Sequence, residues 1–195
     1  MQINIENLSI SYNNHTVIDK FSYTINSGEK IALVGVSGTG KTSIINAIMN
    51  LIPYEGNISF SETPRIATVF QEDRLIEELS VFTNIHMTAN GLTNNEIIDY
   101  INSVGLTPRK KVSELSGGMK RRVAILRAIL APSNLLIMDE PFKGLDRTTK
   151  ELIMNLISKK APDTTMIIIT HDMSEATYFN SRIINIDSYV SQEPG

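Results

Sequence analysis

A chain of 195 residues with 42% hydrophobic residues is long enough to bury a sizeable core in one or two domains. Its formal net charge of −3 gives no general attraction to nucleic acid or anionic membranes, and its lack of cysteine excludes disulfides and cysteine-ligated metals. The histidines His15, His86 and His171 are too far apart in sequence to have metal-ligand spacing.

The first 34 residues predict antiparallel strands. Apolar residues alternate with polar neighbours from Ile3 to Tyr12 and from Phe21 to Ile25, with Asn-Asn and Ser-Gly turns between the runs. This start is unlike a signal peptide, and no apolar run approaches the roughly 20 residues that span a bilayer. We therefore expect any membrane role to depend on a partner.

The next segment predicts a strand, a glycine loop and a helix that stops at Pro53. The loop "GVSGTGKTS" fits the phosphate-binding pattern G-x-x-x-x-G-K-[ST] in the strand-to-helix context that this pattern requires. In such a loop Lys41 reaches the β- and γ-phosphates of a nucleotide and the Thr42 hydroxyl binds Mg²⁺. A purely structural glycine-rich turn is the alternative. The residues expected to contact the nucleotide are Gly35, Ser37, Gly38, Thr39, Gly40, Lys41, Thr42 and Ser43.

The middle of the chain predicts helices. Thr93 and Glu96 form a capping box before an apolar helical run. A second helix begins near Ser116, within "LSGGMKRR", and ends before Pro132. A serine and two glycines at a helix N-terminus can bind an anion, although a simple serine N-cap with two loop glycines explains the same residues. The basic clusters at 109–111 and 120–122 are interpreted as solvated faces, because no aromatic residues are interleaved with them.

Strands and helices alternate in the last third, which predicts a parallel sheet. We expect strands at 135–138, 166–169 and 183–186, a short helix after the second, and a longer helix at about 147–160 with Asp146 as its N-cap. The polar tail after Asp187 is expected to be loosely packed.

The stretch "LLIMDEP" places Asp139 and Glu140 at the C-terminal end of a buried strand, where open α/β sheets bind ligands. Because Mg²⁺ needs few carboxylates when phosphates and waters complete its shell, Asp139 suffices for the metal. Glu140 is then free to act as a general base or to orient the attacking water. In isolation, two surface carboxylates at a strand end would explain these residues equally well.

The order of "GVSGTGKTS", "LSGGM" and "LLIMDEP" resembles the ATP-binding-cassette (ABC) ATPases, over nearly the whole chain. In that family two cassettes pair head to tail, and the signature helix of one closes on the γ-phosphate held by the other. The resemblance implies that Ser116, Gly117 and Gly118 serve the nucleotide of a partner.

The resemblance implies four further roles. Gln71 in "VFQED" matches the Q-loop glutamine near Mg²⁺, and His171 in "IIITHD" matches the switch histidine at the γ-phosphate. Asp146 matches the D-loop residue at the dimer interface. Tyr12 matches the aromatic that stacks on adenine, although an aromatic on a strand is as often a core residue. The implied catalytic residues are Glu140, His171, Lys41 and Gln71, and the implied metal site is Thr42, Gln71 and Asp139.

One position departs from the general family pattern. Met119 stands where many cassettes have glutamine, so a polar role at this position is lost. "LSGGM" and the Q-loop region are nevertheless similar to the cassettes of nitrate, sulfonate and taurine importers. The chain is shorter than most members, and we expect no regulatory C-terminal domain.

The resemblance implies an α/β fold: a P-loop NTPase (RecA-like) core with a parallel sheet, an N-terminal antiparallel β subdomain and a small inserted helical subdomain. We expect one nucleotide-binding domain over 1–195. Residues 1–71 and 132–195 would form the ATP-binding core with the antiparallel subdomain, and residues 72–131 the helical signature subdomain.

The implied function is a subunit that binds and hydrolyses ATP with Mg²⁺ and powers solute transport through separate transmembrane permease subunits. The implied location is the cytoplasmic face of a bacterial membrane. The implied partners are a second nucleotide-binding subunit, for which a homodimer suffices, and an extracytoplasmic solute-binding protein. No nucleic-acid partner is expected. The alternative is a soluble cassette acting on DNA or ribosomes, but the sequence has neither a long coiled-coil insertion nor a second cassette. A third possible function is a cassette that binds ATP without catalytic activity. The presence of Lys41, Glu140 and His171 argues against it.

Overall fold

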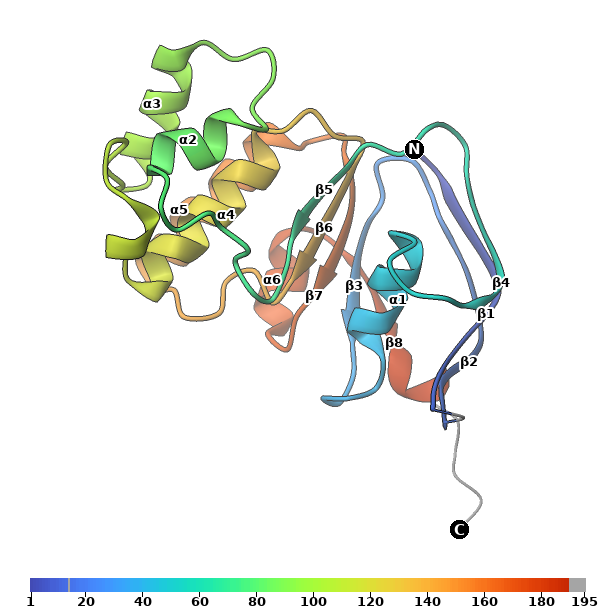
Figure 1. Cartoon of the computed structure of the whole chain (residues 1–195). Coiled ribbons are helices and arrows are strands. Elements are labelled where there is room, and N and C mark those ends of the chain that lie inside the picture. Colours follow the sequence, from blue (N-terminus) through green and yellow to red (C-terminus); the bar gives the residue numbers. More distant parts are fainter. Residues whose placement is uncertain (14, 190–195) are drawn as a thin grey trace.

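Two β-sheets and a set of helices make up the computed structural model, which describes residues 1–13 and 15–189 (Figure 1). The larger sheet is parallel, with the order β5-β6-β7-β3-β8: Ile66–Val69, Leu135–Asp139, Thr165–Ile169, Lys30–Val34 and Arg182–Asn185. The smaller sheet is antiparallel, with the order β2-β1-β4: His15–Ile25, Ile3–Tyr12 and Glu55–Phe60. The predicted combination of a parallel and an antiparallel sheet is confirmed.

The central parallel strands are covered on both faces. Every residue of β6 and β7 is buried, and successive side chains alternate between two hydrophobic clusters. Leu136 and Met138 face the cluster with most of the helices, whereas Leu135 and Ile137 face the cluster that contains α1 (Lys41–Ile48) and the antiparallel sheet. Because both faces are covered, these strands are continuous apolar runs in the sequence.

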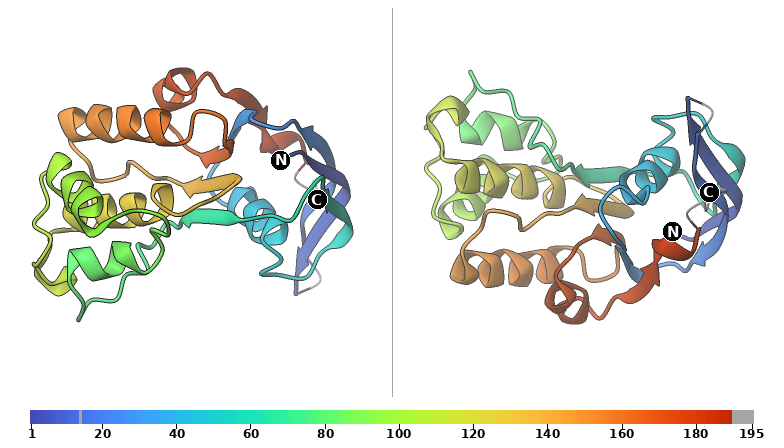
Figure 2. Two further views of the ribbon diagram at one scale, coloured as in Figure 1. Left: turned by 90° about the horizontal axis from the view of Figure 1, so that it is seen from above. Right: turned by 90° about the horizontal axis from the view of Figure 1, so that it is seen from below.

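Helix α1 lies between the two sheets, where Ile44, Ile45 and Ile48 are buried (Figure 2). The antiparallel strand β1 stays buried on one face because its register shifts between Ile5 and Leu8. This irregularity is a β-bulge, which inserts an extra residue and so changes the phase of the alternation. It explains why the apolar positions change from odd to even numbers along one strand.

The other end of the molecule is helical (Figures 1 and 2). It contains α2 (Val81–His86), α3 (Asn94–Ser103), the short 3₁₀ helix η1 (Val112–Glu114), α4 (Gly117–Ile129) and α5 (Arg147–Lys160), and α6 (Met173–Tyr178) follows β7. The predicted capping box at Thr93 and the N-caps Ser116 and Asp146 are confirmed. Among the residues that the structure describes, no helix has the length and apolar character needed to cross a membrane.

Three expectations about elements need correction. Strands β4 and β5 were not predicted, because the sequence of this region has weak strand signals and both strands depend on their partners β1 and β6. The last strand ends at Asn185 rather than 186. The first two residues after Asp187 are not loosely packed. Ser188 and Tyr189 belong to the 3₁₀ helix η2 (Ile186–Tyr189), and the Tyr189 ring packs edge-on against Phe21 with 4.9 Å between ring centroids. The remainder of the predicted loose tail, 190–195, lies outside the described residues.

Candidate functional site

All five strands of the parallel sheet end at one edge, and the segments that follow β3, β5, β6 and β7 line one cleft of about 490 Å³. Asp139 of β6 is in register with Ile169 of β7, which in turn is in register with Leu33 of β3. The carboxyl edge of an open parallel sheet is where such folds bind ligands. The predicted site residues that line the cleft are Tyr12, Ser37, Gly38, Gly40, Lys41, Thr42, Ser43, Gln71, Asp139, Glu140 and His171.

The glycine loop leads into a helix N-terminus that has no side-chain cap. Gly40 is the N-cap of α1 at φ +87°, and no side chain caps this helix, in contrast to α2, α3, α4, α5 and α6. A Cβ at Gly40 would lie 2.8 Å from Val17 Cγ1, so glycine is required for both conformation and space. The first N–H groups of α1, which have no side-chain cap, therefore have the arrangement that favours an anion at a helix N-terminus.

Two residues of the predicted nucleotide set support the loop without lining the cleft. Gly35 has φ +150°, and a Cβ there would lie 2.6 Å from Asp187 Oδ1. The same carboxylate oxygen accepts a 2.9 Å hydrogen bond from the Val36 N–H. Thr39 Oγ1 donates to the Val36 carbonyl at 2.8 Å.

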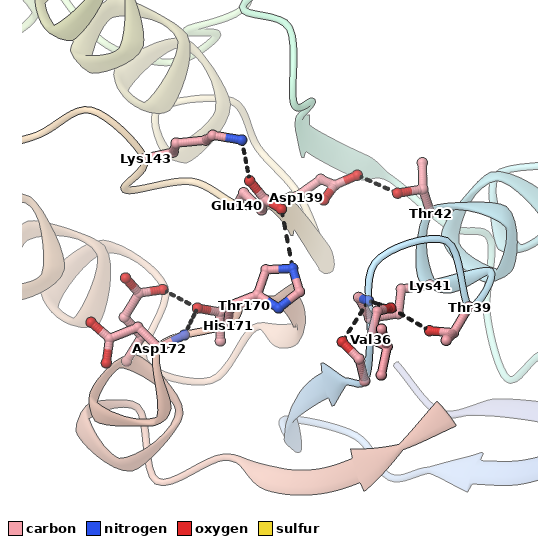
Figure 3. Close-up of polar contacts among 12 residues, drawn as sticks. Val36, Thr39, Lys41, Thr42, Asp139, Glu140, Lys143, Thr170, His171 and Asp172 are labelled. Carbon is pink, nitrogen blue, oxygen red and sulfur yellow. Dashed lines mark hydrogen bonds and ion pairs between the residues drawn. The ribbon is translucent and has the colours of Figure 1, made fainter. Parts of the chain in front are cut away.

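Lys41 is buried inside the phosphate loop, with 6% of its surface exposed. Its Nζ donates to the carbonyl oxygens of Gly35 at 2.9 Å and Val36 at 2.6 Å (Figure 3). These acceptors are neutral, so they orient the ammonium without cancelling its charge. A phosphate entering the loop would meet a cation that is already in place.

Thr42 and Asp139 supply two adjacent oxygen ligands of the kind that Mg²⁺ takes. Thr42 Oγ1 donates to Asp139 Oδ2 at 2.9 Å, and Asp139 is 3% exposed (Figure 3). Burial raises the pKa of the Asp139 carboxyl, and the hydrogen bond from Thr42 opposes that rise. Within the described parts of the chain, no group of three or more His, Asp or Glu residues could hold a metal ion. A hydroxyl and a carboxylate are oxygen ligands that fit Mg²⁺, an ion that takes one or two protein carboxylates and completes its shell with water and phosphate oxygens.

Glu140 lies between two basic side chains (Figure 3). Its Oε2 accepts from Lys143 Nζ at 2.9 Å, and its Oε1 is 3.4 Å from His171 Nε2. The hydrogen bond from Lys143 lowers the pKa of the Glu140 carboxyl, so the side chain is ionised and can accept a proton. Its backbone has the left-handed value φ +45°, which is costly for a residue with a side chain.

Gln71 and Tyr12 both line the cleft. Gln71 is exposed, and its carbonyl accepts from Arg121 Nη1 at 3.4 Å. Tyr12 is 45% exposed and donates its hydroxyl to Ser43 Oγ at 3.2 Å, so the interpretation of Tyr12 as a core residue is wrong.

Ser116, Gly117, Gly118 and Asp146 do not line the cleft. Ser116 Oγ accepts from the Met119 N–H at 3.4 Å, and Asp146 Oδ1 accepts from the Thr149 N–H at 3.0 Å, so both cap their own helices. The fold of one chain thus leaves these residues outside the cleft that contains Lys41.

The sequence reading missed three basic residues around the site. Arg121 was expected on a solvated face, but it is 4% exposed and this expectation is wrong. Lys143 holds Glu140, as described above. Lys150 Nζ bonds to Asp172 Oδ2 at 2.6 Å and to Glu175 Oε1 at 2.5 Å, which links α5 to the segment after His171. The sequence gives no signal for the contacts of Arg121 and Lys150, because their acceptors lie on distant segments, whereas the Lys143 contact is local, three positions from Glu140.

Comparison with known sequences finds one family and many relatives. The profile of the family described as "ABC transporter" matches residues 18–143. The chain is 32% identical to the spermidine/putrescine import ATP-binding protein PotA of Mycoplasma capricolum, over 99% of this chain and 61% of that protein. It is also 32% identical to the aliphatic sulfonates import ATP-binding protein SsuB of Yersinia pestis, over 95% of this chain and 72% of that one. The chain thus spans about three-fifths of the length of the Mycoplasma relative.

Comparison with solved structures agrees with these matches. The dimeric post-hydrolysis state of the ATP-binding cassette MJ0796, bound to ADP and Pi, superposes with a TM-score of 0.85 at 25% identity, over 97% of both chains. A putative ABC transporter ATP-binding protein from Pyrococcus furiosus, at 24% identity, has the same fold with a TM-score of 0.85. The expected P-loop NTPase fold is confirmed.

Proposed function

Since this chain belongs to the ABC transporter family, we propose that it is a subunit that binds and hydrolyses ATP to power the movement of a solute through separate transmembrane subunits. The observation that carries the proposal is the single cleft that joins Lys41 and Thr42 to Asp139, Glu140 and His171. Relatives with the same sequence identity are named for import of spermidine/putrescine and of aliphatic sulfonates. The proposal therefore names solute transport but not the solute.

The phosphate loop would bind the ATP. The N–H groups at the start of α1 and the Lys41 ammonium would hold the phosphates, and Tyr12 would cover the adenine from the antiparallel sheet. The remaining proposed nucleotide contacts are Gly35, Ser37, Gly38, Thr39, Gly40, Thr42 and Ser43.

Thr42, Asp139 and Gln71 would hold Mg²⁺ together with phosphate oxygens, and the ion would supply charge neutralisation at the β- and γ-phosphates. Glu140 would accept a proton from the attacking water or orient it. His171, 3.4 Å from Glu140 in this state, would reach the γ-phosphate from the end of β7.

A second cassette completes the proposed site. Ser116, Gly117 and Gly118 begin a helix of 13 residues outside the cleft, so they would close on the γ-phosphate held by the partner, with Asp146 at the same interface. The dimeric cassette structures support a second nucleotide-binding subunit, and a homodimer suffices because this chain contains all of the motifs. ATP favours the closed dimer because its γ-phosphate adds contacts that ADP lacks, and hydrolysis removes them.

We place residues 1–71 and 132–195 in an ATP-binding core that includes the antiparallel sheet, and 72–131 in a helical subdomain. The helical part would carry movement from Gln71 to the transmembrane partner. The proposed location is the cytoplasmic face of a bacterial cell membrane, and the importer names of the relatives extend the proposal to an extracytoplasmic solute-binding protein.

The test is the capture of partners by the Glu140→Gln protein with ATP and Mg²⁺, from solubilised membranes and from cytosol, beside an assay of phosphate release by the unmutated chain. We expect phosphate release and an integral membrane protein in the captured material. Capture of ribosomes or nucleic acid without a membrane protein would move the function to the soluble class. Absence of phosphate release by the unmutated chain, both alone and in complex with the membrane protein that the capture identifies, would refute the ATPase itself.

A further inference from the structure

Arg121 of α4 is a buried charge that contacts two distant segments of the site. Its side chain is 5% exposed. One segment is residues 139–141, which run from the last residue of β6 into the following turn, here called the carboxylate turn. The other is residues 70–74 after β5, here called the Gln71 segment. The acceptors are the carbonyls of Asp139, Glu140 and Pro141 at 2.8, 2.7 and 2.8 Å, and the Phe70 carbonyl, Asp73 Oδ1 and Gln71 carbonyl at 2.5, 3.1 and 3.4 Å.

Only arginine can make this set of contacts. Its planar guanidinium has five N–H donors, whereas a lysine ammonium has three on one atom. Nε and Nη2 point to the carboxylate turn and Nη1 points to the Gln71 segment. A buried cation that loses its acceptors is costly, so the two segments are held in a fixed relation while Arg121 stays in place.

The carboxylate turn has a backbone conformation that needs support. Glu140 has φ +45°, a value that residues with side chains rarely adopt. Arg121 Nη2 donates to the carbonyls on both sides of that residue's N–Cα–C unit, those of Asp139 and Glu140. The orientation of the Glu140 side chain into the cleft thus depends on a group from another element.

The Gln71 segment is attached to α4 at a second point. Arg127 Nη1 donates to the Arg74 carbonyl at 2.8 Å, and its Nη2 donates to the Asp73 carbonyl at 3.1 Å. Both contacts go to the Gln71 segment, and among the described residues no hydrogen bond joins the Arg127 side chain to the carboxylate turn. Arg121 is therefore the α4 side chain that connects both segments.

We propose that Arg121 is a positioning residue that fixes the Glu140 backbone and couples it to Gln71, so that a displacement of α4 reaches the water-activating carboxylate and the Q-loop together. Arg121 does not line the cleft and acts through backbone carbonyls, not on the nucleotide. The inference rests on the proposed ATPase function.

The test compares Arg121→Met and Arg121→Lys with the control Arg122→Gln. Arg122 neighbours Arg121 on α4, but it donates to the carbonyls of Val104 and Gly118, away from the cleft. We expect kcat of Arg121→Met to fall by about 10- to 100-fold with KM for ATP within about threefold, because the phosphate loop is untouched while Glu140 is misplaced. Arg121→Lys should keep the charge but lose the planar fork that bonds both segments at once, so its kcat should also fall.

A second measurement separates positioning from general packing. Amide hydrogen exchange in Arg121→Lys should accelerate in both 139–141 and 70–74, and stay unchanged in β7 and in α1. If Arg121→Met does not fold, Arg121→Lys alone decides the outcome. A wild-type-like kcat in the folded Arg121 variants would overturn the inference and leave the proposed function intact. Faster exchange in only one of the two segments would do the same. A wild-type protein without ATPase activity would instead refute the proposed function.

Discussion

Thr42 and Asp139 are 97 positions apart in the chain, yet Thr42 Oγ1 donates a 2.9 Å hydrogen bond to Asp139 Oδ2. The contact joins the first residues of α1 to the last residue of β6. It brings together the two oxygen ligands that the proposed Mg²⁺ site requires.

Replacement of Asp139 by Asn should raise the Mg²⁺ concentration needed for half-maximal ATPase activity by about tenfold or more, because a neutral amide oxygen binds a hard divalent cation more weakly. The measurement is phosphate release against Mg²⁺ concentration at saturating ATP. Asp163→Asn, a change at an exposed bend that does not line the cleft, is the control and should leave the curve unchanged. If the curve for Asp139→Asn overlays the wild-type curve, Asp139 is not a ligand of the Mg²⁺ ion.

Replacement of Glu140 by Gln should lower the rate of ATP hydrolysis by about 100-fold or more, because the amide cannot accept a proton. ATP binding should persist, and the variant should elute as a dimer with ATP but not with ADP. Glu151→Gln is the matched control, since the Glu151 side chain is exposed and forms its ion pair with the exposed Arg147 on the same helix. ATP hydrolysis by Glu140→Gln at the wild-type rate would rule out the proposed role.

A mixture of Lys41→Ala and Ser116→Arg proteins tests whether the signature helix acts on the partner's nucleotide. Each variant alone should be inactive. In a head-to-tail dimer of the two, one site combines an intact phosphate loop with an intact signature, so an equal mixture should recover about a quarter of wild-type activity. If both motifs served the same nucleotide within one chain, mixing would restore nothing.

Replacement of Lys150 by Met should raise the pKa of Asp172. The hydrogen bond from Lys150, followed by those from Ser174, lowers the pKa of Asp172 from 3.8 to about 2. Because the pKa of Asp172 is lower in the folded protein than in the unfolded chain, its ionised carboxyl stabilises the fold at pH values above the unfolded pKa. This contribution is lost as the pH falls from about 4 to about 2. The carboxyl ¹³C shift of Asp172 should report an ionised group at pH 3 in the wild type and a larger protonated fraction in Lys150→Met, and equal titration curves would contradict the assignment.

Replacement of Ile137 by Ala should lower the free energy of unfolding by about 2–5 kcal/mol, because Ile137 of β6 is fully buried in the hydrophobic cluster that contains α1. Ile183→Ala in β8 is the matched control, since Ile183 is 47% exposed, and it should cost clearly less. The measurement is urea denaturation followed by circular dichroism, and equal losses in the two variants would show that the burial of β6 contributes little.

The sequence by itself determined the features whose physics is local. The phosphate loop, the capping box at Thr93 and the N-caps Ser116 and Asp146 depend on residues within a few positions of one another, and their spacing could be read directly. The continuous apolar run of β6 also identified a strand covered on both faces.

Only the tertiary structure decided which distant groups meet. Strands β4 and β5 carry weak signals of their own and become strands by pairing with β1 and β6. The burial of Arg121 was unpredictable, because the acceptors that make a buried guanidinium tolerable are backbone carbonyls, which every residue has and no motif marks. The shared edge of the parallel sheet is what brings Thr42 and Asp139 within hydrogen-bonding distance.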